Sequence, residues 1–184
     1  MSSDRKRGPI LETARLRGHP LESRHLDDLQ RIFGDPEVTR TLGGLRNAEQ
    51  IEKIFERFDS HWEQHGYGPW FFADASGAFV GYAGVIETRV DDLAGIELLY
   101  ALAANHWRQG FGSEMAECIV AQAFGPLQIE ELLCFTLTTN RGSQRVMENA
   151  GFRYLREITH ATLPHVLYSQ SLAEWRVRTP QTSA

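Results

Sequence analysis

The chain has 184 residues, of which 42% are hydrophobic, and a formal net charge of −5 at neutral pH. This length suits one domain that buries a sizeable core without a metal or a disulfide framework. The charge argues against a nucleic acid or an anionic membrane as partner, since only residues 5–7 cluster positive charge. Without an apolar signal core or an apolar run near the roughly 20 residues of a membrane span, the chain is expected to be cytoplasmic, with Cys118 and Cys134 reduced.

The first third of the chain predicts a strand and two helices. Residues 1–9 are polar and are expected to be a flexible tail, followed by a single domain over residues 10–177 and a C-terminal tail over residues 178–184. A short strand over residues 14–17 precedes Ser23, which is placed to cap a helix that Asp35-Pro36 ends. The inward face of that helix carries Leu26, Leu29, Ile32 and Phe33.

The second helix is the clearest in the sequence. Asn47 and Gln50 resemble a capping box at its start, and a glycine-rich turn at residues 66–69 ends it. Its apolar positions keep a period of 3.6 residues and are Ile51, Ile54, Phe55, Phe58 and Trp62. From Trp70 the period becomes that of strands. Residues 70–73 and 79–88 then predict a hairpin, and Asp91-Asp92 turns the chain back.

A strand, a glycine-containing loop and a helix follow in immediate succession. The strand Gly95–Ala103 is apolar apart from Glu97, which suits burial on both faces. Gly110 and Gly112 open the helix that starts near Phe111, so the first backbone N–H groups of this helix have no helical partner. Such donors at the positive end of a helix favour a phosphate, although an ordinary packing turn would use the same glycines. The P-loop Gly-Lys-Ser/Thr is absent, and Met115 stands where a dinucleotide loop has its third glycine.

The last third predicts a strand at residues 132–138, a helix at residues 143–150 closed by Gly151, and a hairpin of residues 152–160 and 165–171 with Pro164 in its turn. The whole order indicates a mixed α/β fold with about seven strands, mostly antiparallel, and helices on both faces of the sheet. The strands before and after the glycine helix must be parallel, and ligands settle at the carboxyl ends of such strands.

Several motifs in this order resemble the GCN5-related N-acetyltransferases (GNAT), and in particular the branch of the ribosomal-protein N-terminal acetyltransferases (RimJ/RimL-like). Residues 108–113 are similar to the Arg/Gln-x-x-Gly-x-Gly/Ala loop that binds the pyrophosphate of acetyl-coenzyme A in that family. The other matching stretches are DPEV (35–38) with LGG (42–44), YGPW (67–70), NRGSQRVMENAGF (140–152) and YSQSLAEW (168–175). Together they extend from about Leu11 to Trp175.

The resemblance implies the GNAT fold, with a sheet splayed between its fourth and fifth strands, and acetyl-CoA as cosubstrate without a metal. The pantetheine arm would insert between the splayed strands. By resemblance the cofactor is bound by the main chain of Leu99, Tyr100, Ala101 and Leu102, by the pyrophosphate loop Arg108, Gln109, Gly110, Phe111, Gly112 and Ser113, and by Asn140 and Ser143.

The implied reaction is attack of a neutral amine on the thioester, which needs a base and assistance to the leaving thiolate. Glu97 is the expected base, because burial can raise its pKa, unless it serves a structural pair. Many relatives carry a tyrosine acid where Met147 stands, and Met147 cannot donate a proton. Ser143, or a water it holds, is therefore the candidate acid, unless it only packs and bonds the cofactor. Tyr168 is a second candidate, although packing of the last strand is the favoured role for it. His160 and His165 flank the last turn, where they either contact an acceptor or are simply exposed.

Two other functions stay open beside an N-acetyltransferase. Met147 is compatible with a catalytically idle acyl-CoA-binding module, and a structural protein without cofactor would keep the same fold. The sequence does not decide between a protein N-terminal α-amino group, a polyamine and an antibiotic amine as acceptor; the resemblance favours the first. The oligomeric state is also open, with Trp175 and the last hairpin compatible with a homodimer.

Overall fold

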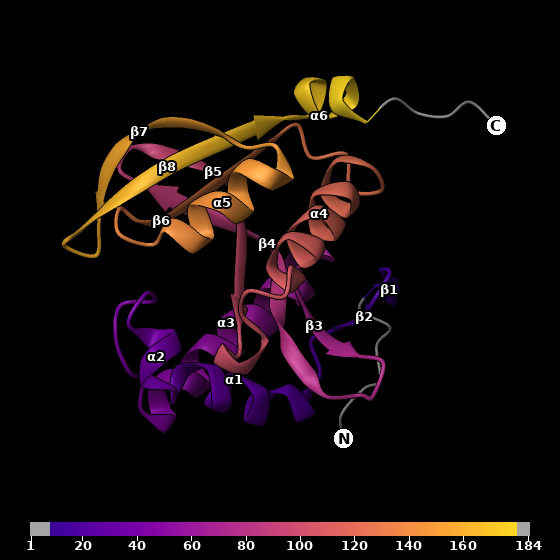
Figure 1. Ribbon diagram of the computed structural model, residues 1–184, viewed down its shortest axis with the longest axis vertical. Coiled ribbons are helices and arrows are strands. Elements are labelled where there is room, and N and C mark those ends of the chain that lie inside the picture. The colour runs from indigo at the N-terminus through magenta and orange to yellow at the C-terminus, as the bar shows by residue number, and fades with distance from the viewer. Residues whose placement is uncertain (1–7, 180–184) are drawn as a thin grey trace.

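The computed structural model describes residues 8–179, which form one eight-stranded sheet with helices on both faces (Figure 1). The strand order is β1-β2-β3-β4-β5-β6-β8-β7. The mixed, mostly antiparallel sheet predicted from the sequence is confirmed, with one more strand than expected. The predicted tails, residues 1–9 and 178–184, lie largely outside the described residues. No helix in the described part of the chain is long and apolar enough to cross a membrane.

The N-terminal elements are β1 (Leu11–Glu12), β2 (Leu16–Pro20), η1 (Ser23–His25), α1 (Leu26–Phe33) and α2 (Pro36–Thr39). Two details differ from the prediction. Glu22, and not Ser23, takes the cap position of the first helical turn. Asp35-Pro36 does not only end a helix but starts α2, because the Asp35 carboxylate accepts from Glu37 N–H at 2.8 Å and proline suits a first helical position.

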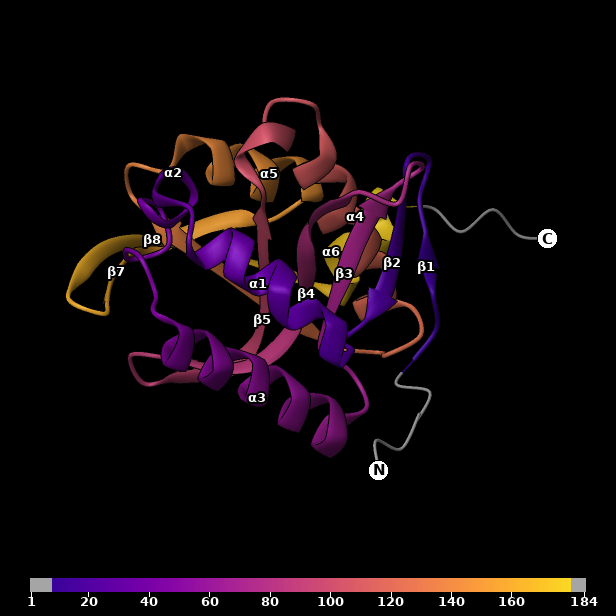
Figure 2. The same ribbon diagram turned by 90° about the horizontal axis from the view of Figure 1, so that it is seen from below.

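Helix α3 (Ala48–His65) begins and ends as the sequence predicts. Gln50 N–H donates to Asn47 Oδ1 at 2.9 Å and Asn47 N–H donates to Gln50 Oε1 at 3.0 Å, which completes the capping box. Gly66 ends the helix with a φ of 73°, a left-handed conformation that favours glycine. Figure 2 shows α1 and α3 lying side by side over one face of the sheet.

The central strands are β3 (Pro69–Asp74), β4 (Phe79–Val90), β5 (Leu93–Leu102) and β6 (Glu131–Leu137), and helix α4 (Phe111–Phe124) follows β5 after the short η2 (Ala104–His106). Strand β5 pairs with β4 along its whole length. By contrast, β5 and β6 are parallel and pair only at Ile96–Leu132 and Glu97–Leu133. The two strands therefore separate after Glu97, as the predicted splay requires.

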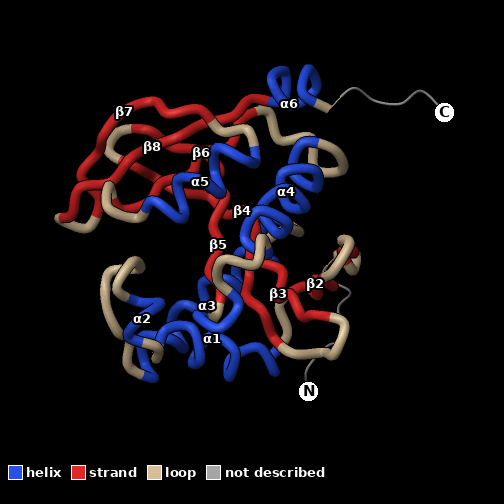
Figure 3. Tube along the Cα trace, in the orientation of Figure 1, coloured by secondary structure: helices blue, strands red, loops and turns tan. Residues whose placement is uncertain are grey.

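The C-terminal elements are α5 (Arg141–Ala150), β7 (Arg153–His160), β8 (Leu163–Ser171) and α6 (Leu172–Arg178). Pro164 lies inside β8, and the turn is made by Ala161 and Thr162, both with positive φ. Helix α6 was not predicted, although Ser171 and Glu174 form a capping box at its start. Figure 3 shows α4 and α5 in front of the sheet, and Figure 2 shows α3 on the opposite side of the sheet. Cys118 and Cys134 are free, as predicted.

A buried histidine joins the first helical turn to the sheet. The His25 ring stacks on Phe71 with ring centroids 4.3 Å apart, and its Nδ1 accepts a hydrogen bond from Glu22 N–H at 2.9 Å. An accepting ring nitrogen carries no proton, so His25 is neutral in the fold. Burial, followed by the nearby charges of Arg24 and His19, lowers the pKa of His25 to about 4.

We expect His25 to make the protein less stable as the pH falls from about 6.5 towards 4. In this window the unfolded chain binds a proton at His25 that the folded chain does not, so acidification favours unfolding. A shift from 6.5 to about 4 corresponds to about 3 kcal/mol at the acid end of the window. Urea denaturation at pH 7 and pH 4.5 should show a smaller loss of stability for His25→Gln than for the parent. Equal losses in the two proteins would exclude His25 as the cause.

Candidate active site

The loop between β5 and α4 presents unpaired backbone donors. Arg108 and Gly110 have φ values of 60° and 83°, and Gly110 is the cap residue of α4 without any side-chain cap. Helical bonding starts only when Glu114 N–H donates to the Gly110 carbonyl at 3.1 Å. Within residues 8–179, the N–H groups of residues 108–113 donate to no protein acceptor. Alternating backbone conformations ahead of a helix N-terminus form a concave anion site.

Glycine is favoured at Gly110 and at Gly112 for different reasons. Gly110 needs its left-handed φ, whereas Gly112 is buried, and a Cβ there would lie 3.2 Å from Val146 Cγ2 of α5. Gly112 thus lets α4 pack closely on α5, so the packing explanation holds for that residue. Asn149 of α5 also donates a hydrogen bond to Ser113 Oγ at 3.2 Å. The anion site is consequently fixed to the helix that follows β6.

The separation of β5 from β6 leaves main-chain groups of β5 without a strand partner. Ala103 N–H donates to β4 at 3.0 Å, and because main-chain groups alternate along a strand, those of Leu99 and Ala101 also face β4. The groups of Tyr100 and Leu102 face the opposite edge, beyond the last residue pair of β6. An extended ligand at this edge would add hydrogen bonds in the manner of a strand.

Because main-chain groups alternate along β5, only half of the residues predicted to bind the cofactor through their main chain can do so at the open edge. Of the four residues, Tyr100 and Leu102 offer main-chain groups to the open edge, and the Leu102 carbonyl already accepts from the Trp107 ring at 3.0 Å. Leu99 and Ala101 can contribute only side chains there, because their main-chain groups are used by the β4 ladder.

Glu97 stands at the residue where the two strands separate. Its carboxylate is near the Thr88 side chain of β4 and the positive charge of Arg57 on α3. Burial raises the pKa of Glu97 to about 7, and the hydrogen bond with Thr88 and the Arg57 charge offset burial only in part. Glu97 forms no ion pair with any of residues 8–179. A carboxylate with this pKa is suited to accept a proton at neutral pH.

The first turn of α5 meets β5 through two hydroxyl groups. The Tyr100 hydroxyl lies 2.7 Å from Ser143 Oγ and donates to the Ser143 carbonyl at 3.0 Å. Burial raises the pKa of Tyr100 well above its usual value, so this phenol stays protonated. The sequence predicts Tyr100 only as a main-chain contact. The contact of the Tyr100 hydroxyl with Ser143 could not be predicted from the neighbouring sequence, because it depends on how α5 docks on β5.

The remaining predicted residues have structural partners. Asn140 caps α5 by accepting from Ser143 N–H at 3.2 Å, and its Nδ2 donates to Thr136 Oγ1 at 3.0 Å. Met147 is fully buried. Tyr168 donates to Glu148 Oε1 at 3.2 Å, near the other end of α5, and is therefore separated from Ser143 by more than one helical turn. The structure thus places Tyr168 in packing and leaves Ser143 as the hydroxyl beside β5.

Two histidines at the end of the last hairpin gather around a phenylalanine of β6. The ring centroids of His160 and His165 lie 4.8 and 5.9 Å from that of Phe135, and 5.4 Å from each other. Burial, followed by the His165 charge, lowers the pKa of His160. Phe135 has the same strand parity as Leu133, the residue opposite Glu97. The cluster therefore lies on the Glu97 face of the sheet.

Comparison with protein-family models matches residues 15–153 to the family described as acetyltransferase (GNAT) domain. Two curated relatives cover most of the chain. The FsC-acetyl coenzyme A-N(2)-transacetylase of Aspergillus fumigatus is 29% identical over 190 residues, which are 92% of this chain and 79% of that protein. The uncharacterized protein YkkB of Bacillus subtilis is 25% identical over 162 residues, which are 87% of this chain and 94% of that protein.

Solved structures share the fold. An acetyltransferase from Agrobacterium tumefaciens has a TM-score of 0.77 at 22% identity, covering 89% of this chain and 94% of that one. The ribosomal L7/L12 α-N-protein acetyltransferase RimL, in complex with coenzyme A, has a TM-score of 0.73 at 14% identity, covering 89% and 98%. Similar folds also occur in the aminoglycoside acetyltransferase AAC(6')-Ib with acetyl-CoA, TM-score 0.74 at 18% identity, covering 91% and 99%. A spermidine N-acetyltransferase from Vibrio cholerae has a TM-score of 0.71 at 13% identity, covering 87% and 97%. At these identities the likeness shows the fold and not the acceptor.

Proposed function

The chain belongs to the GNAT acetyltransferase family, and from this premise we propose that it transfers the acetyl group of acetyl-CoA to a protein N-terminal α-amino group, with Glu97 as base. The observation that carries the proposal is that β5–β6 pairing ends at Glu97, and that the unpaired donors of residues 108–113 follow in the loop between β5 and α4. Pantetheine would run along the free edge of Tyr100 and Leu102, and the diphosphate would sit at the start of α4.

The proposed reaction is direct transfer. The neutral amine nitrogen attacks the thioester carbon, the C–S bond breaks, and the amine proton goes to Glu97 directly or through a water. The coenzyme A thiolate leaves and takes a proton from Ser143 or from a water that Ser143 holds, and solvent returns a proton to that donor. A covalent intermediate on Cys134 is not needed, and burial raises the pKa of Cys134 well above its usual value, which keeps it a poor nucleophile.

The charges around Glu97 support an α-amino acceptor over a polycation. Arg57 places a positive charge on the same face as Glu97, and a polyamine or an aminoglycoside would bring several further positive charges to it. An α-amino group has a pKa of about 7.7 to 8.0, so a base with a pKa of about 7 needs to remove only one weakly held proton. The reducing cytoplasm, where such acceptors are made, fits the two free cysteines.

An acceptor screen tests the function. The protein is incubated with acetyl-CoA and peptides with free N-termini, spermidine or an aminoglycoside, and release of free thiol is measured. Peptides should react fastest, and the same peptides with a blocked N-terminus should not react. Faster turnover of spermidine or the aminoglycoside would show that the acceptor is not a protein N-terminal α-amino group.

A second candidate is an acyl-CoA-binding module without turnover, favoured by the buried Met147 at the position of the family's tyrosine. Thiol release separates the two. Stabilisation by coenzyme A without thiol release for any amine would favour the binding module, because a ligand bound only to the native state raises stability.

We expect Ser143→Ala to lower turnover by less than about tenfold. The departing thiol has an ordinary pKa of about 8.5 and needs little acid assistance, and a water can enter the space of the hydroxyl next to Tyr100. Single-turnover rates at saturating acetyl-CoA measure this step. The matched control is Tyr100→Phe, which removes the other hydroxyl of the pair. A loss of about a thousandfold in Ser143→Ala with unchanged affinity would make Ser143 an obligatory acid.

A further inference from the structure

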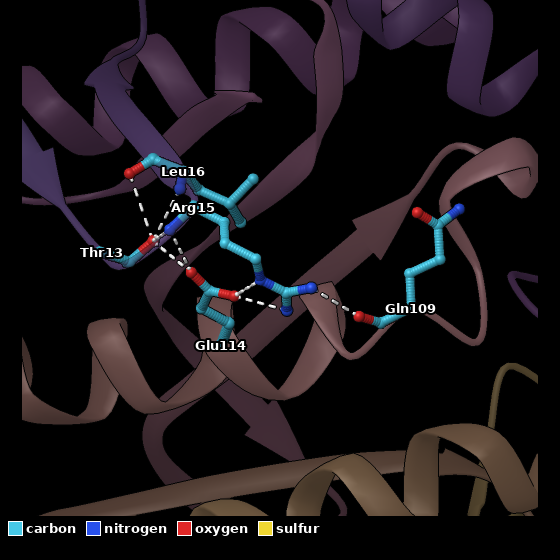
Figure 4. A network of polar contacts seen from close by, with 5 residues as sticks. All are labelled: Thr13, Arg15, Leu16, Gln109 and Glu114. Carbon is cyan, nitrogen blue, oxygen red and sulfur yellow. Dashed lines mark hydrogen bonds and ion pairs between the residues drawn. The ribbon is translucent and has the colours of Figure 1, made fainter. Parts of the chain in front are cut away.

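The side chain of Arg15, in the turn between β1 and β2, reaches the start of α4 (Figure 4). Arg15 Nη1 donates to the Gln109 carbonyl at 2.8 Å, and its guanidinium lies 4.4 Å from the centroid of the Phe111 ring. Arg15 Nε donates to Glu114 Oε2 at 2.7 Å. One side chain, about 95 residues away in sequence, thus contacts Gln109 and Phe111 of the loop that holds the unpaired donors and Glu114 in the first turn of α4.

The bond to Gln109 sets the direction of a donor. In a trans peptide the carbonyl and the following N–H point in opposite directions. With the Gln109 carbonyl held towards β1 by Arg15, Gly110 N–H is directed away from Arg15, to the other side of the loop. A Cβ at Gly110 would lie 3.3 Å from Arg15 Nη2, a tight contact that would push the guanidinium aside, and the φ of 83° itself favours glycine.

Glu114 fixes Arg15 in return and is itself neutralised. Its carboxylate accepts from Thr13 Oγ1 at 2.6 Å and from Arg15 N–H at 2.8 Å, in addition to the guanidinium. Partial burial alone would raise the pKa of Glu114, but the hydrogen bonds from Thr13 and Arg15 and the Arg15 charge outweigh burial and lower it. A free carboxylate in the first turn of α4 would oppose an incoming diphosphate. The pair cancels that charge.

We propose that Arg15 is a positioning residue for the coenzyme A diphosphate: through Gln109, Phe111 and Glu114 it holds the loop of residues 108–113 in the conformation that binds the anion. Arg15 adds no net charge to the site, since Glu114 balances it. Its contribution is the orientation of backbone donors. The proposal rests on the proposed function, because it takes the loop to be the diphosphate site.

Two ligands distinguish this role from a general structural one. Coenzyme A carries the diphosphate, whereas pantetheine carries only the arm that would lie along β5. Arg15→Gln should raise the dissociation constant for coenzyme A by about tenfold and leave that for pantetheine unchanged, measured by NMR titration at millimolar pantetheine. The turnover number at saturating acetyl-CoA should stay at the parental value while KM rises. Arg15→Lys, which keeps the charge but not the three contacts, should show the same pattern more weakly.

Arg17→Gln is the matched control, because Arg17 lies two residues after Arg15, on β2, and among the described residues its only ion pair is with Glu12 at 3.6 Å. It should bind both ligands like the parent. Unchanged coenzyme A affinity in folded Arg15→Gln would overturn the proposal, and so would an equal loss for pantetheine. The double variant Arg15→Gln, Glu114→Gln should regain only part of the lost affinity for coenzyme A. Full recovery would mean that Arg15 serves only to neutralise the Glu114 charge. Failure of the parent itself to bind coenzyme A would instead remove the proposed function.

Discussion

Replacing Glu97 by glutamine is expected to lower the acetylation rate by about 10²- to 10⁴-fold at neutral pH while the affinity for acetyl-CoA stays unchanged. Glutamine keeps the shape of the side chain and can still bond Thr88, but it cannot accept the proton of the attacking amine. The main-chain edge of β5 and the loop before α4, which would bind the cofactor, do not involve the Glu97 carboxylate. The loss should therefore fall on the chemical step.

The pH dependence identifies the cause. Burial raises the pKa of Glu97 to about 7, so the carboxylate form grows as the pH rises through 7, and the parental rate should rise with it. In Glu97→Gln the rise of the acetylation rate around pH 7 should be absent. The rate should recover only at a pH at which the amine loses its proton without a base from the protein. For an α-amino acceptor that occurs near pH 8, whereas a lysine-type amine would need a pH near 10.4.

Glu87→Gln provides the matched control, since Glu87 lies on the neighbouring strand β4 and its side chain is 61% exposed. It should leave both the rate and its pH profile unchanged. Equal rates for Glu97→Gln and the parent from pH 6 to pH 10 would remove Glu97 from the mechanism and leave it a structural carboxylate.

The strand, loop and helix that carry the candidate site could be predicted because each has a local signal. An apolar run with one carboxylate predicts β5, and Gly110 and Gly112 before a helical period predict the start of α4. The parallel pairing with β6 follows from the helix between the strands. The splay itself could be expected only from the family resemblance, because no residue pattern marks where two strands stop pairing.

What the sequence did not predict depends on contacts between distant segments. Tyr100 was expected to act through its main chain, and its hydroxyl meets Ser143 only because α5 docks on β5. Arg15 and Glu114 come together from opposite ends of the first two thirds of the chain. Helix α6 is a different case, because Ser171 and Glu174 carry a local capping signal. The helix has only 7 residues, which is too short for an apolar period to show in the sequence.

Replacing Ser113 by aspartate is expected to weaken coenzyme A binding by more than tenfold while the fold becomes no less stable. Ser113 is the third residue of α4, where a carboxylate interacts favourably with the helix dipole and so does not harm the helix. In the proposed site the same carboxylate would face the diphosphate charge. Two unit charges of like sign within about 8 Å cost about 2 kcal/mol at an effective dielectric constant of about 20, which exceeds a tenfold change in affinity.

This position separates binding from folding better than Gly112, where any side chain would press on Val146 and disturb the packing of α4 on α5. Ser113→Asn is the control, because asparagine has the size of aspartate without its charge and can still accept the bond from Asn149. Isothermal titration with coenzyme A and thermal unfolding of both variants should show an affinity difference between Asp and Asn that shrinks as salt is added. If the two variants bind coenzyme A equally at low salt, the diphosphate does not lie at the start of α4, and the unpaired donors of residues 108–113 serve some other ligand.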